Sequence, residues 1–176
     1  LTNELQLENA NVSLDAATVA GLNAEMEIKI SVKPADLDAT GLSAEQKAQV
    51  GNNTVYDFSM AYTDGTAVTE FAGKVTVSLP YELKEGEDID SIDIWYIDNE
   101  GNPARMTGTY SNGFVTFETD HFSYYTVTRL TTAERCARYG HIEVKSEKAA
   151  TCTADGFNMS VCQRCGEELS KTVYPM

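Results

Sequence analysis

Five side chains that can bind a metal ion through nitrogen or sulfur lie near the end of the chain: Cys136, His141, Cys152, Cys162 and Cys165. Zinc prefers four such ligands in a tetrahedron, and the Cys-x-x-Cys-Gly segment that starts at Cys162 supplies two thiolates from one tight turn. The glycine after the second cysteine relieves crowding of the backbone. We therefore predict a structural zinc site formed by Cys162, Cys165, Cys152 and either His141 or Cys136.

The same cysteines allow a different cross-link. In a secreted protein, four cysteines can form two disulfides, and three alternative pairings exist. The residues alone leave zinc and disulfides open. In the zinc case, an ion held by four protein ligands has no open position for a substrate, so we expect no catalytic role for the metal.

Composition divides the chain into two parts. Residues 1–131 contain no cysteine and hold 21 acidic and 7 basic residues, whereas residues 132–176 hold six of each. The second part is below the size at which hydrophobic burial alone usually stabilises a fold, so it needs a metal or a covalent cross-link. We predict one domain over residues 1–131 and a small cysteine-rich, zinc-ribbon-like module over residues 132–176.

Alternation of apolar and polar residues predicts strands in the first part. Val75, Val77 and Leu79 share one face of segment 74–79, which is the period of a half-buried strand. Comparable segments are 26–32, 55–60, 92–97, 105–110, 113–118 and 122–128. Asn112-Gly113 predicts a type I′ hairpin turn. Many short strands with hairpin turns are typical of an antiparallel β-sandwich, so the predicted fold class is all-β.

The alternation also predicts which side chains form the core of this sandwich. The inward set is Val75, Val77, Leu79, Ile94, Tyr96, Val115, Phe117 and Phe122. Only residues 43–50 are predicted to be helical, because Ser43 suits the N-cap and Gln46 the capping-box position.

The net charge of the chain and the motifs that it lacks argue against several classes of partner and activity. The net charge of −14 argues against a nucleic acid or an anionic membrane as partner, because both would repel the chain. The sequence has no apolar run of about 18 residues that could span a membrane. It also lacks the common nucleotide-binding, metalloprotease and hydrolase motifs, so we expect no enzyme.

The acidic residues between 85 and 93 lack EF-hand spacing, and we expect them to be solvated. The chain starts without a secretion leader, which suggests a piece of a longer protein.

Several segments of the first part, taken in sequence order, carry a resemblance to a known type of module. They are residues 50–58, 73–81, 86–88, 95–98 and 119–125. Together they resemble, over about residues 12–129, a module repeated in large surface proteins of Gram-positive Firmicutes, where it often lies beside S-layer homology or glycan-active domains. The tail, with Gly140-His141, Cys152 and the Cys-x-x-Cys-Gly segment, is similar to a cysteine-rich repeat that follows such modules.

This resemblance implies a location and a role. It implies an extracellular protein, secreted or on the cell surface, in which the chain acts as a non-catalytic spacer or adhesion module. The implied partners are a host or cell-wall glycan or protein and other domains of the same parent chain. Related repeats carry three cysteines and one Gly-His each, an odd thiol count that suits a metal better than disulfides.

Two alternatives use other residues. A carbohydrate-binding accessory module of a secreted glycosidase or protease would use Trp95, Tyr96 and exposed tyrosines as a stacking platform, although segment 92–97 also fits a central strand that is apolar on both faces. His121-Phe122-Ser123 is similar to the cleavage triplet of self-processing ZU-type sandwiches, in which the serine hydroxyl attacks the preceding carbonyl and the histidine assists as a base. We expect the Phe122–Ser123 bond to stay intact.

Overall fold

The computed structural model of the chain describes residues 3–98 and 100–175. It divides into two compact units between Arg129 and Leu130. We call the part up to Arg129 the sandwich unit and the part from Leu130 onward the ribbon unit. Each unit is described separately below.

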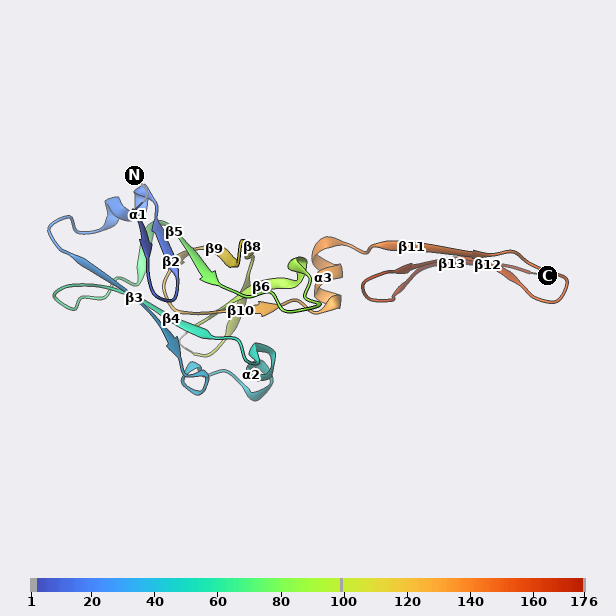
Figure 1. The fold of residues 1–176 in the computed structure, drawn as a ribbon, viewed down its shortest axis with the longest axis horizontal. Helices are drawn as coiled ribbons and strands as arrows, with labels where there is room; N and C mark the ends of the chain where they lie inside the picture. The colour runs from blue at the N-terminus through green and yellow to red at the C-terminus, as the bar shows by residue number, and fades with distance from the viewer. Residues whose placement is uncertain (1–2, 99, 176) are drawn as a thin grey trace. The chain divides into compact units, whose positions relative to one another are not determined.

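The sandwich unit consists of two five-stranded antiparallel sheets (Figure 1). The first sheet has the order β1-β2-β5-β9-β8, with β1 (Asn3–Gln6), β2 (Asn11–Leu14), β5 (Glu70–Pro80), β9 (Phe114–His121) and β8 (Thr109–Ser111). The second has the order β3-β4-β10-β6-β7, with β3 (Ile28–Ala35), β4 (Val55–Tyr62), β10 (Tyr124–Arg129), β6 (Ile92–Ile97) and β7 (Pro103–Met106). The predicted all-β sandwich is confirmed.

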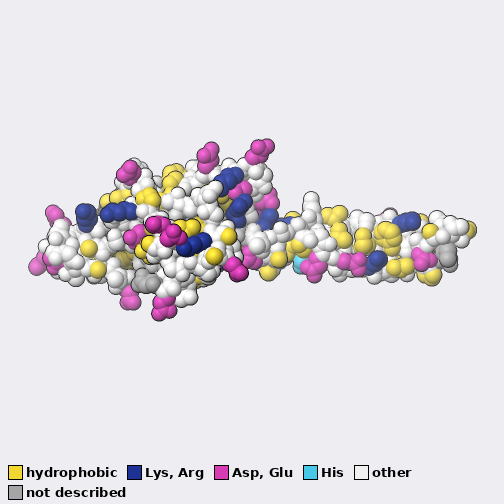
Figure 2. All heavy atoms as spheres, turned by 90° about the horizontal axis from the view of Figure 1, so that it is seen from below, with side chains coloured by type: hydrophobic (Ala, Val, Ile, Leu, Met, Phe, Trp, Pro, Cys, Tyr) yellow, Lys and Arg dark blue, Asp and Glu magenta, His cyan; other side chains and the backbone are white. Residues whose placement is uncertain are grey.

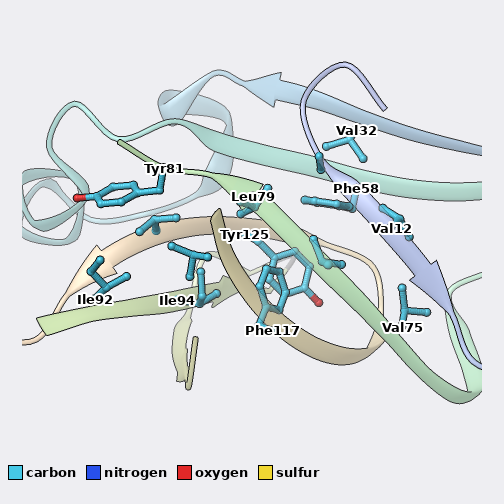
Figure 3. Close-up of a cluster of buried hydrophobic side chains, with 14 of the residues drawn as sticks. Val12, Val32, Phe58, Val75, Leu79, Tyr81, Ile92, Ile94, Phe117 and Tyr125 are labelled. Carbon is cyan, nitrogen blue, oxygen red and sulfur yellow. The ribbon is translucent and has the colours of Figure 1, made fainter. Parts of the chain in front are cut away.

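One apolar core lies between the two sheets (Figure 3). In β5 every second residue from Val75 to Leu79 is fully buried, as the alternation predicts. The ring of Phe117, from the first sheet, lies 5.0 Å from the ring of Tyr125, from the second. The predicted inward set is confirmed: six members are buried, and Tyr96 and Phe122 are half-buried against the same core.

Tyr125 also fixes the connection between β9 and β10. Its hydroxyl donates a hydrogen bond of 2.8 Å to the carbonyl of His121, four residues upstream, and lies 2.8 Å from the hydroxyl of Thr119. A tyrosine that returns to the backbone in this way is a feature of immunoglobulin-like sandwiches. The bond holds the point where the chain passes from one sheet to the other.

The structure corrects the predicted strand over residues 105–110. It forms two strands: β7 ends at Met106 in one sheet, and β8 begins at Thr109 in the other. Gly108 lies at the crossing, where a Cβ atom would stand 2.7 Å from a methyl carbon of Val115. The hairpin turn that follows β8 agrees with its prediction, because Asn112 and Gly113 both have positive φ, 51° and 81°.

Helices are short. The predicted helix is α2 (Ala44–Val50), with Ser43 as N-cap and a complete capping box to Gln46. The prediction of a single helix in the first part is wrong, because that part also forms α1 (Ala16–Gly21). A further helix, α3 (Thr132–Tyr139), lies in the second part. Two 3₁₀ turns, η1 (Leu37–Thr40) and η2 (Ile89–Ser91), complete the sandwich unit. No helix among the described residues has the length and apolar character needed to cross a membrane.

The ribbon unit contains α3 and a three-stranded antiparallel sheet of order β11-β12-β13. The strands are β11 (Glu143–Lys148), β12 (Gly156–Cys162) and β13 (Glu168–Tyr174). Glu143 pairs with Cys162 at one end of the first hairpin, and Lys148 pairs with Phe157 at the other. The first of these two ends carries the cluster of ligand side chains described next.

Candidate metal centre

Four potential metal ligands converge in the ribbon unit: Cys136, His141, Cys162 and Cys165, whose ligand atoms all lie within 4.8 Å of one another. Cys136 comes from α3, and His141 follows the helix directly. Cys162 is the last residue of β12, and Cys165 lies in the turn before β13. A helix and a hairpin therefore share one site.

The local sequence explains how α3 positions Cys136 and His141. Thr131 caps the helix, and a reciprocal capping box joins it to Glu134, which is a sequence signal for a helix start. Gly140, with φ of 78°, ends the helix, and its N–H donates to the carbonyl of Cys136 at 2.9 Å. The carbonyl of Gly140 accepts a 3.0 Å hydrogen bond from the guanidinium of Arg164. That bond ties the end of the helix to the turn that carries the other two ligands.

The second pair of ligands comes from the Cys162–Gly166 turn, which we call the knuckle. Gly166, with φ of 73°, donates its N–H to the carbonyl of Cys162 at 2.8 Å. The N–H of Cys162 donates to the carbonyl of Glu167, also at 2.8 Å. These two bonds close a tight loop. Both thiols therefore project from one short segment, as a Cys-x-x-Cys-Gly sequence predicts.

The distances suit a tetrahedral zinc ion. The sulfur atoms of Cys136 and Cys162 are 3.6 Å apart, and Sγ of Cys165 lies 3.5 Å from Nδ1 of His141. Zn–S bonds of about 2.3 Å and Zn–N bonds of about 2.0 Å place ligand atoms about 3.8 Å (S to S) and about 3.6 Å (S to N) apart. The widest pair, at no more than 4.8 Å, has to contract by about 1 Å to reach this geometry.

The thiols differ in acidity. Burial raises the pKa of Cys136 to about 12, and the neighbouring thiol of Cys162 adds to this. Burial also disfavours the thiolate of Cys162, but hydrogen bonds from the backbone N–H of Cys165 and from His141 outweigh it and lower the pKa to about 5. The two shifts have opposite directions, so Cys162 is the more acidic of these two thiols. A metal at this site would require thiolates, because cysteine binds metals in that form.

Cys152, which the sequence analysis placed among the ligands, lies outside the cluster. It is exposed in the loop between β11 and β12. The register puts that loop at the Lys148–Phe157 end of the hairpin, whereas the cluster lies at the Glu143–Cys162 end. Five residues of strand separate the two ends by about 17 Å. Cys136 and His141, which the sequence offered as alternatives, are both in the cluster instead.

Trp95, the tryptophan of the alternative stacking platform, does not lie at the surface. Trp95 is 5% exposed and packs in a second apolar cluster with Leu42, Val50 and Val55. Tyr96 points to the opposite side and is half-buried against the main core. Both faces of β6 are therefore covered, as expected for a central strand.

The acidic segment near β6 is only partly solvated, which corrects the expectation from sequence. Asp93 is completely buried, and its carboxylate lies 3.3 Å from the guanidinium of Arg105. That guanidinium also lies 5.4 Å from the ring centroid of Trp95. Asp93 of β6 is therefore paired with Arg105 of β7, its neighbour in the sheet, instead of being exposed to solvent.

The His121-Phe122-Ser123 triplet connects β9 to β10. The Ser123 hydroxyl donates a 2.8 Å hydrogen bond to the carbonyl of Ile97, and the Ser123 carbonyl accepts one from the N–H of Phe58 at 2.9 Å. Nδ1 of His121 lies 2.8 Å from the carboxylate of Asp120. Serine and histidine are thus each engaged with a different neighbour.

No protein-family model matches the chain, and no curated protein matches it. The Cys₃His cluster and the two-sheet sandwich are the structural features of the chain that bear on its function.

Proposed function

We propose that Cys136, His141, Cys162 and Cys165 bind one structural Zn²⁺, and that the chain is a non-catalytic, extracellular spacer or adhesion segment of a large Gram-positive surface or secreted protein. The observation that carries the zinc proposal is the convergence of four ligand atoms within 4.8 Å. A site filled by four protein ligands leaves no position for a substrate, so its role is structural.

The ribbon unit has reason to depend on a metal. Among its described residues, the buried hydrophobic side chains are Leu130, Cys136 and Cys162. So small a core offsets little of the conformational entropy that is lost on folding. Structural zinc contributes about 10–16 kcal/mol in small zinc-binding peptides, so metal binding can supply what burial does not.

The arrangement also disfavours two disulfides. Cys136 and Cys162 are close enough to pair, with sulfur atoms 3.6 Å apart. The second disulfide would have to join Cys165 to Cys152, at opposite ends of the β11–β12 hairpin. Disulfide geometry needs Cα atoms within about 7 Å. A pair of disulfides therefore requires a different fold of the ribbon unit.

Support for a spacer or adhesion role comes from the sandwich unit. Its only tryptophan is buried, so the strongest candidate for a sugar-stacking platform is absent from the surface. Acidic side chains are spread over this unit in the view of Figure 2, which favours solubility in a large exposed protein. The Gram-positive, extracellular setting and the glycan or protein partner rest on the sequence resemblance alone.

Metal analysis of the full chain tests the zinc proposal. We expect about one equivalent of zinc per chain after purification without chelators. Cys136→Ser should lose most of it, because it removes a ligand. Cys152→Ser is the matched control, since it makes the same change outside the cluster, and it should keep the full equivalent. Protein without metal whose intact mass is lower by four protons contains two disulfides, and this result would reject the proposal.

A further inference from the structure

His141 presents its two ring nitrogens to different groups. Nδ1 faces the cluster, 3.5 Å from Sγ of Cys165, and Nε2 lies 3.6 Å from Oε2 of Glu167. A metal-binding histidine usually donates its second ring N–H to a carboxylate or a carbonyl, which fixes its tautomer and raises its basicity. Glu167 stands where such a carboxylate is needed.

The backbone that builds the knuckle also positions Glu167. Its carbonyl accepts the N–H of Cys162 at 2.8 Å, so any shift of Glu167 disturbs the first knuckle ligand. Its carboxylate is not among the four clustered groups and lies 4.0 Å from Sγ of Cys165. The Cys165 thiol can donate to this carboxylate only while it keeps its proton, which it gives up when it binds a metal as a thiolate. The contact with His141 is therefore the one through which the Glu167 side chain can act on a metal-bound site without becoming a ligand.

We propose that Glu167 is a positioning residue for the metal: it accepts the Nε2–H of His141 and so makes Nδ1 the metal-binding nitrogen. This inference rests on the proposed zinc site. At 3.6 Å the two atoms are at ion-pair distance, and a small rotation of either side chain when zinc binds shortens the contact to a hydrogen bond. The sequence signal is the position of Glu167, directly after the knuckle glycine.

Zinc affinity of the full chain, measured by competition with a chromophoric chelator, tests the role of Glu167. Glu167→Ala should raise the zinc dissociation constant by about tenfold or more, the usual effect of losing such a partner. Glu168→Ala is the matched control: it removes the same charge from the next residue, whose carboxylate faces Lys171 at 3.9 Å. An exposed pair of this kind contributes little, so the control should stay within about twofold of the wild type.

A double-mutant cycle separates positioning from simple charge. His141→Cys leaves four cysteine ligands and removes the ring on which Glu167 acts. In that background Glu167→Ala should leave zinc affinity within about twofold, because coupling between residues vanishes when their contact is gone. An equal loss in both backgrounds means that Glu167 acts through its charge alone and overturns the proposal.

Nitrogen NMR of the His141 ring gives an independent readout. In the zinc-loaded wild type we expect metal at Nδ1 and a proton at Nε2, and metal at Nε2 would overturn the inference whatever the affinities are. The outcomes also separate the two proposals. A wild type that binds no zinc rejects the zinc site itself, whereas a wild type that binds zinc with Glu167→Ala unchanged rejects only the role of Glu167.

Discussion

At the scale of single residues, the hydrogen bonds of Ser123 bear on whether its hydroxyl acts as a nucleophile or has a structural role. Acyl shift at Phe122–Ser123 needs a free hydroxyl directed at the preceding carbonyl and a base within reach. In the structure the Ser123 hydroxyl donates its hydrogen bond to the carbonyl of Ile97 in the neighbouring strand. The N–H of Phe58 donates to the Ser123 carbonyl, which belongs to the following peptide, so the sheet ladder begins directly after the Phe122–Ser123 bond.

We therefore predict that the chain remains a single species of 19.2 kDa during storage at neutral pH. Intact-mass spectrometry over several days checks this. The control is Ser123→Ala, which should give an equally stable single species. Two fragments that separate after Phe122 in the wild type, and that are absent in Ser123→Ala, would contradict the prediction and support the self-processing alternative.

Residue types and spacing predicted most of the metal site. The knuckle follows from ligand chemistry alone, because few other patterns place two thiols on one turn. The sequence offers His141 and Cys136 only as alternatives. The sequence prediction includes Cys152 and only one of His141 and Cys136, whereas the cluster contains both of these and lacks Cys152. That outcome depends on the register of the β11–β12 hairpin. Register is set by the whole hairpin, and Cys152 falls in the loop at the far end.

At the scale of elements, the capping box of α3 links local helix stability to the metal site. Cys136 is positioned by this helix of eight residues, whose first turn is held by Thr131 and Glu134. Thr131→Ala removes the cap and should cost about 1 kcal/mol of helix stability. Because zinc binding requires the folded helix, we expect zinc affinity to fall by about fivefold.

Ser43→Ala is the control for this prediction. Ser43 caps α2 with the same type of capping box, but α2 belongs to the sandwich unit. Its loss should lower the urea midpoint of the sandwich unit and leave zinc affinity unchanged. Equal zinc affinity in Thr131→Ala and the wild type would show that α3 is held in place by the metal alone.

The sequence predicts strands correctly where one face of a long strand is buried. It does not predict the short strands and the short helix. β5 and β9 alternate over many residues, so their period is unambiguous. β1 and β2 have only four residues each, and α1 has six, too few to show a period. For α3, the sequence does contain a capping-box pair, Thr131 and Glu134, which marks the start of a helix. β7 and β8 were merged because the sequence shows no change of sheet at Gly108.

At the scale of the whole molecule, the two units differ in what stabilises them. The sandwich unit buries a continuous apolar core between its sheets, whereas the ribbon unit gathers its buried sulfur atoms at one end of a single sheet. Hydrophobic burial of about 25 cal/mol per Å² therefore favours the first unit. We propose that the second depends on metal ligation.

This difference predicts that removing zinc affects the units unequally. Trp95, the only tryptophan, lies in the sandwich unit and reports on that unit alone. A strong chelator should leave the urea midpoint of Trp95 fluorescence unchanged, because no ligand lies in the sandwich unit. Amide hydrogen exchange in β11–β13 should accelerate to nearly the rate of an unfolded chain, and Cys162→Ser should reproduce this pattern without chelator. A chelator-induced fall in the Trp95 midpoint would instead mean that the binding free energy of the metal stabilises both units together.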